Sequence, residues 1–120
     1  MASIDALRSL LAEVSESTGP SPALDKHIAD VLDVVPADAA APPWTASTEE
    51  AVNLFRQLLK KRPMDLVHHP DREQYFCTVK LYGTMPATPP YVVRSAKTAA
   101  IAILAAMIET LIAVEIDYWS

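Results

Sequence analysis

The last stretch of the chain constrains the fold most, because it predicts a long helix with apolar residues on nearly every side. The segment that follows Ser95 is rich in alanine, the strongest helix former, and Ser95 or Thr98 is expected near its N-cap. Leu104 and Ile108 fall on one side of this helix, whereas Met107 points elsewhere. A helix that is apolar nearly all round must be covered nearly all round.

Two arrangements would cover this helix. Either the first two predicted helices enclose it, or a second copy of the chain packs against it. The second arrangement predicts a homo-oligomer through residues 95–116, and we expect this oligomer. The helix is not expected to be a membrane anchor, because its longest apolar run, Ala99–Ile108, has ten residues. A membrane-spanning helix requires about 20.

The chain is expected to form a single domain over residues 1–120 in a reducing, cytoplasmic location. Its length suits one hydrophobic core. Cys77 is the only cysteine, so an internal disulfide is excluded. Asp5 and Glu13 interrupt the N-terminal segment where a signal peptide would be basic and then uniformly apolar.

Two amphipathic helices are predicted before residue 36. Ser3 is the candidate N-cap of the first, and Gly19-Pro20 is its stop. Ser21 followed by Pro22 repeats the start signal, and the second helix is expected to end near Pro36. The apolar residues at helical spacing are Ile4, Leu7, Leu10, Leu11 and Val14 in the first helix and Leu24, Ile28, Val31, Leu32 and Val35 in the second.

A third helix is predicted after the connector at residues 36–43. Ser47 and Glu50 are spaced as a capping box, in which each side chain accepts a hydrogen bond from the backbone N–H of the other residue. The basic residues 60–62 are expected in the last turn, where the helix dipole favours cations. Trp44, just before the cap, is interpreted first as part of this scaffold.

After Pro63 the apolar period changes from that of a helix to that of a strand. Residues 74–82 alternate strictly, with Cys77 on the expected core face, and residues 64–69 predict a weaker strand. Residues 64–82 therefore predict a β-hairpin, and residues 91–93 predict a short edge strand after a proline-rich loop.

Three segments together resemble the phage ABA sandwich domain family of small bacteriophage and prophage proteins. They are "LDKHIADVLDVV", "PPWTASTEEAVNLF" and "PATPPYVVRSAKTAAIAILAAMIETL", and the resemblance covers about residues 21–56 and 86–112. It implies an α/β fold, a helix–sheet–helix (α-β-α) sandwich, to which the residue patterns add the antiparallel hairpin and the long C-terminal helix. It also implies a phage or prophage origin, and hence the cytoplasm of a bacterial host. It implies no reaction.

The charges are segregated along the sequence. Residues 1–50 hold nine acids and two bases, residues 51–98 hold eight bases and three acids, and residues 99–120 hold three acids. Such a distribution can steer a charged partner, although solvated or mutually facing segments explain it more simply.

No catalytic or metal site is expected. His68, His69, Asp71 and Cys77 lack the spacing of a zinc motif, and adjacent residues on a strand point to opposite faces. No serine lies in a Gly-x-Ser-x-Gly turn, and the two glycines of the chain cannot supply a phosphate-binding loop. We therefore predict a protein that is not an enzyme and has no cofactor.

Two binding functions remain. The first is a non-enzymatic phage or prophage accessory protein that binds a host macromolecule, a host protein among the candidates, in counter-defence. The second is a small-ligand protein that holds a nucleotide-like anion, because aromatic faces combined with cations are the chemistry that holds a base. Its candidate residues are Trp44, Tyr82, Tyr91 and Arg94, with Phe76 and Lys97 in the same basic segment.

Overall fold

A computed structural model describes residues 3–36, 38–60, 62–81 and 91–119, without the side chains of residues 115–119. The elements are α1 (Ile4–Glu16), α2 (Pro22–Leu32), α3 (Thr48–Leu58), β1 (Met64–His69), the short 3-10 helix η1 (Pro70–Arg72), β2 (Gln74–Lys80), β3 (Tyr91–Ala96) and α4 (Ala99–Trp119). The predicted α/β class, with an antiparallel hairpin and a long C-terminal helix, is confirmed.

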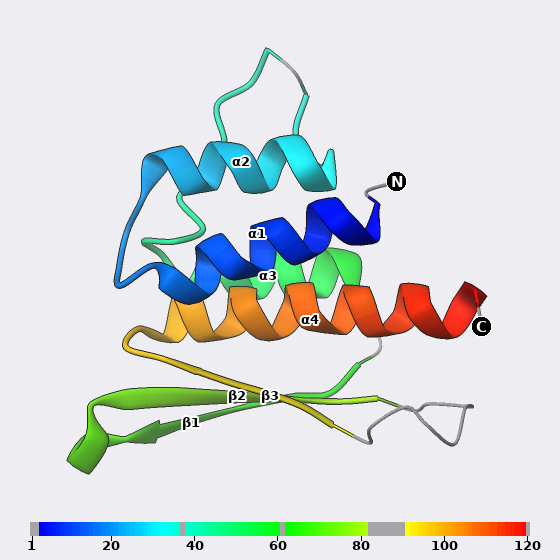
Figure 1. The fold of residues 1–120 in the computed structure, drawn as a ribbon. Helices are drawn as coiled ribbons and strands as arrows, with labels where there is room; N and C mark the ends of the chain where they lie inside the picture. Colours follow the sequence, from blue (N-terminus) through cyan, green and yellow to red (C-terminus); the bar gives the residue numbers. More distant parts are fainter. Residues whose placement is uncertain (1–2, 37, 61, 82–90, 120) are drawn as a thin grey trace.

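Helix α4 forms the middle layer of the molecule (Figure 1). The three-stranded sheet covers one side of α4, and α1 and α3 cover the other side. Helix α2 packs mainly on the outside of α1, so the expectation that the first two helices enclose α4 is right for α1 and wrong for α2. The described α-helices therefore all lie on one side of the sheet, whereas the helix–sheet–helix order that the resemblance implies would place helices on both sides.

The chain itself covers α4. Every residue from Ala100 to Ile108 is buried, and so are Thr110 and Ile112. The one polar side chain among these buried residues is satisfied within the helix, because the Thr110 hydroxyl donates a hydrogen bond of 2.7 Å to the carbonyl oxygen of Ala106. A second copy of the chain is thus not needed to bury the centre of this helix.

The sheet has the strand order β1-β2-β3, and both pairs of strands are antiparallel. Cys77 and Val79 on the central strand, and Val92 beside them on β3, are buried against α4. The predicted core face of β2 is therefore confirmed. Strand β3 runs on to Ala96, beyond the three residues that the sequence predicts.

The predicted helix starts are confirmed at three serines. Ser3, Ser21 and Ser47 each accept a hydrogen bond from the backbone N–H three residues later. Helix α4 is capped by Thr98, whose hydroxyl accepts from the N–H of Ile101. The start at Ser95 is wrong, because Ser95 pairs with Phe76 in the sheet.

Three details of the helix ends differ from the prediction. Helix α2 ends at Leu32, where Asp33 adopts a left-handed conformation with φ of 53° that stops the helix before Pro36. The capping box of α3 is half formed, because the N–H of Ser47 donates to the carbonyl oxygen of Pro43 instead of the Glu50 carboxylate. Lys60 and Arg62 lie beyond the end of α3, and Arg56 is the base in its last turn.

Candidate functional site

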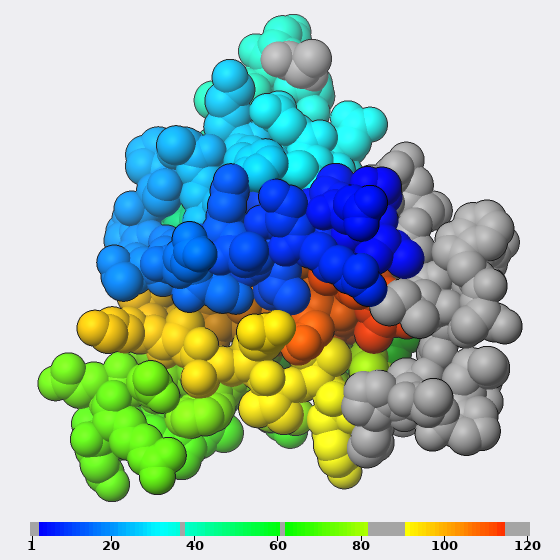
Figure 2. Space-filling model, in the orientation of Figure 1, coloured from blue at the N-terminus to red at the C-terminus, as the bar shows by residue number. Residues whose placement is uncertain are grey.

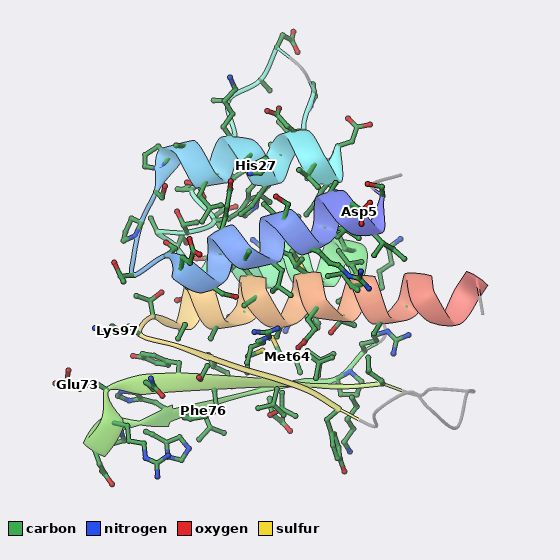
Figure 3. All side chains as sticks on the ribbon, in the orientation of Figure 1. Asp5, His27, Met64, Glu73, Phe76 and Lys97 are labelled. Atoms are coloured by element: carbon green, nitrogen blue, oxygen red, sulfur yellow. The ribbon has the colours of Figure 1, made fainter. Side chains whose placement is uncertain are left out.

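The outer face of the sheet, which is turned away from α4, is the most distinctive surface of the described chain. Val67 is 49% exposed, Tyr91 52% and Val93 54%. Phe76 is half-buried on the same face, and Figure 3 shows it on the side of the sheet opposite to Met64 and α4. We call this surface the open face; its residues are Asp65, Val67, His69, Gln74, Phe76, Thr78, Lys80, Tyr91, Val93 and Ser95.

The register of the strands builds the open face. Val67, Phe76 and Ser95 form one row across the three strands, and Asp65, Thr78 and Val93 form the next. Because side chains on a strand alternate between the two faces, the same alternation that buries Cys77 presents Phe76 and Thr78 to solvent. The ring of His69 meets the ring of Phe76 edge-on, with centroids 4.8 Å apart.

The acidic and basic segments of the sequence lie in different layers of the structure. Residues 3–36 and 38–60, which form the layers of α1, α2 and α3, hold nine acids and four bases. Residues 62–81 and 91–98, which form the sheet and its connection to α4, hold five bases and three acids. The surfaces of α1 and α2 adjoin (Figure 2), so their acids lie on neighbouring surfaces. The molecule has an acidic helical side and a more basic sheet side.

Arg94 is engaged with α4. Its Nε and Nη2 atoms donate hydrogen bonds of 3.1 and 2.9 Å to the two carboxylate oxygens of Glu109. Both side chains are about one-third exposed. This two-point pair fixes the planar guanidinium against the carboxylate and joins β3 to α4. Arg94 lies in the row of Cys77, on the face of the sheet opposite to the open face.

Trp44 and Thr45 belong to the scaffold. Trp44 is 3% exposed and lies in the hydrophobic core. The buried Thr45 joins the segment before α3 to the start of α2, because its N–H donates to the carboxylate of Asp25 at 2.8 Å and its hydroxyl accepts from the N–H of Ser21 at 2.8 Å. The segment before α3 therefore holds the start of α2 in place. Tyr82, the remaining candidate from the sequence, lies outside the described residues.

A hollow of about 500 Å³ lies at the end of α1 and the start of α2. It contains His27, whose Nδ1 lies 2.5 Å from a carboxylate oxygen of Glu13. The nearby serines are used locally, because the Ser17 hydroxyl donates to the carbonyl oxygen of Gly19 and Ser21 caps α2. The sequence gives no signal for this His–carboxylate pair, since only the packing of α1 on α2 brings its members together.

The described part of the chain was searched for groups of metal ligands and for membrane-spanning helices. Residues 3–36, 38–60, 62–81 and 91–119 contain no group of three or more His, Cys, Asp or Glu side chains that could hold a metal ion. No helix in these ranges is both long enough and apolar enough to cross a membrane.

The thiol of Cys77 is expected to react slowly in the folded protein. It is fully buried, and this burial, together with the nearby Asp65 carboxylate, raises the pKa of the thiol from 9.0 to about 12. The thiolate is the nucleophilic form, so at pH 8 iodoacetamide is expected to alkylate the native protein at least about a hundredfold more slowly than the urea-unfolded chain. Equal rates would contradict this burial.

The same pKa shift predicts a dependence of stability on pH. Below pH 9 the thiol is protonated in both states, whereas between pH 9 and 12 the unfolded chain loses its proton first. Stability is therefore expected to fall with rising pH in this window, by up to about 1.4 kcal/mol per pH unit from this group. Urea titrations of Cys77→Ala give the control, because the variant is expected to show a shallower fall over the same window.

No protein-family model, curated protein or solved structure matches this chain. The fold and the open face define it as a small α/β protein with an exposed apolar sheet surface. The resemblance to the phage ABA sandwich domain family stays a prediction.

Proposed function

We propose that the protein is a non-enzymatic binding protein that docks a macromolecule on the open face of its sheet. The observation that carries this proposal is the exposure of Val67, Tyr91 and Val93 on one face, next to Phe76. A contiguous exposed apolar patch with polar residues around it is typical of an interaction site, whereas apolar residues scattered singly need no explanation. Asp65, His69 and Lys80 supply the polar residues here.

The nucleophiles and bases noted above support binding over catalysis. Cys77 is buried with a raised pKa, and Ser17 and Ser21 are occupied by backbone hydrogen bonds. His27 pairs with Glu13 in an open hollow, where no described serine hydroxyl is bonded to it. A general base needs a nucleophile or substrate proton within hydrogen-bond reach.

The biological setting rests on the family resemblance. On that basis the protein is a phage or prophage accessory protein in the bacterial cytoplasm, and its partner is a host macromolecule in counter-defence. A homo-oligomer through residues 95–116 has less support, because α4 is already buried from Ala100 to Ile108 within one chain.

The nucleotide-like small ligand also has less support. Trp44 is in the core, and Arg94 is bonded to Glu109 on the face opposite to Tyr91. These three candidates therefore do not line one concave site.

The proposal predicts that a charge placed on the open face abolishes binding and spares the fold. Val93→Glu is expected to keep the free energy of unfolding within about 0.5 kcal/mol of the wild type, because the side chain is half exposed. A bacterial lysate is divided into a nuclease-treated and a protease-treated portion. Each portion is passed over the immobilised wild type and the immobilised variant, and the macromolecules that each retains are compared. Ala23→Glu, at an exposed position on α2, is the matched control. Retention that survives Val93→Glu, or that Ala23→Glu removes equally, contradicts docking on the open face.

A further inference from the structure

We infer that the open face binds a single strand of nucleic acid, with unpaired bases stacked on Phe76 and Tyr91 and the phosphates held by Lys80 and Arg62. This inference rests on the proposed function, since it names the partner of the same surface.

The two aromatic rings are placed as separate platforms on one face. Tyr91 stands opposite Lys80 in the register of β2 and β3, and Phe76 lies four residues further along β2. At about 3.3 Å per residue, the two positions are about 13 Å apart along the strand direction. Thr78 and Val93 lie between the two rings, and their smaller side chains separate the two stacking positions. Every base has a π-face that can stack on an aromatic side chain, so such platforms suit unpaired bases of any sequence.

The contacts of His69 strengthen the platform at Phe76. Its ring meets Phe76 edge-on, which restricts the orientation of the Phe76 ring and adds a second exposed ring beside it. A ring whose orientation is already restricted loses less conformational entropy when a base stacks on it.

Two cations lie at the Tyr91 end of the sheet. Lys80 is the cross-strand neighbour of Tyr91, and the Arg62 guanidinium donates a hydrogen bond of 3.4 Å to the carbonyl oxygen of Lys80. Among the described residues, neither cation forms an ion pair, in contrast to Arg94. Asp65 is the one carboxylate of the open face, and it stands on β1 opposite Thr78, two residues from Lys80 along β2. No ion pair between Asp65 and Lys80 is formed in the described part of the chain. Among the described residues, neither positive charge is neutralised by an ion pair, so both can meet phosphates.

The distribution of charge over the layers favours a polyanion that approaches from the sheet side. The acidic layers of α1, α2 and α3 repel a phosphate chain. The sheet layer does not, because it holds five bases and three acids, although Glu109 neutralises one of these bases, Arg94. A duplex hides the faces of its bases in the stack, so the aromatic platforms select a single strand. An acidic protein would use the cations and would leave the exposed rings unexplained.

The test is fluorescence anisotropy with a labelled oligothymidylate of about 12 nucleotides, a length within the range that single-strand sites cover. The wild type is expected to bind it and to bind a duplex of equal length more weakly. Tyr91→Ala and Phe76→Leu are each expected to weaken binding at least about fivefold, the lower bound for loss of one stacked base. Phe76→Leu preserves an apolar side chain, so circular dichroism melting is expected to show a folded variant.

The salt dependence tests the phosphate contacts separately. Contacts from two cations predict a slope of log affinity against log salt of about −1.4, and Lys80→Gln is expected to reduce its magnitude by about 0.7. Lys26→Gln, at an exposed lysine on the acidic side, is the matched control and should leave affinity and slope unchanged.

Three results would overturn the inference. They are no binding of the oligonucleotide by the folded wild type, equal binding of oligothymidylate and polyglutamate, and variants at Tyr91 and Phe76 that bind as the wild type does. A second outcome separates this inference from the proposed function. If the wild type does not bind the oligonucleotide but retains a lysate protein that Val93→Glu does not retain, the partner is a protein and the proposed function stands. If neither is retained, both proposals fall.

Discussion

Trp44→Ala is expected to lower the free energy of unfolding by about 3–5 kcal/mol, the range for truncating a buried aromatic side chain to alanine. The reason is that Trp44 is 3% exposed and is part of the core cluster that also contains Phe55 and Leu54. Removal of the indole leaves a cavity that the surrounding helices can fill only in part. The loss is a large fraction of the stability of a small domain, and urea unfolding followed by circular dichroism measures it.

The same substitution separates the scaffold role of Trp44 from the ligand role that the sequence also suggested. Trp44→Phe is the conservative control and is expected to cost less, because it retains most of the apolar volume. Tyr91→Ala, at a residue that is 52% exposed, is expected to change stability by less than about 1 kcal/mol. A Trp44→Ala variant with unchanged stability and lost ligand binding would contradict the buried position.

Local features of this fold were predictable from the sequence because their causes are local. A serine that accepts from an N–H three residues later needs no distant partner, so Ser3, Ser21 and Ser47 were identified correctly as caps. The alternation in β2 likewise identified Cys77 as a core residue. The left-handed Asp33, which ends α2 early, gave no such signal, since aspartate only tolerates that conformation.

The candidate site was less predictable, because each of its features depends on residues that are distant in the sequence. The segment 91–98 looked like a source of free cations, yet Arg94 meets Glu109 across 15 residues. Trp44 stands beside a polar helix start, and only the packing of the core shows that it is buried. Alternation shows that β2 has two faces, but it cannot say that the helices cover just one of them. That arrangement creates the open face.

Docking on the open face requires that the chain bury α4 by itself. If α1, α3 and the sheet cover this helix, as its burial indicates, the core does not need the exposed apolar surface of the sheet, and a partner can bind there. If α4 were covered in part by a second copy, the same exposed residues would instead lie near a subunit interface. The two cases differ in the thermodynamics of unfolding, because the stability of a dimer depends on protein concentration.

Ile103→Ala and Leu104→Ala are therefore each expected to lower the free energy of unfolding by about 2–5 kcal/mol, because both side chains are fully buried and consecutive helix residues point about 100° apart. Val114→Ala, at a residue that is 36% exposed on the same helix, is the control and is expected to cost less than about 1 kcal/mol. Urea unfolding at protein concentrations a hundredfold apart should give the same midpoint for the wild type and for both core variants. A midpoint that rises with concentration would show that a second chain covers α4. A cost at Ile103 or Leu104 as small as that at Val114 would contradict the burial of these two side chains.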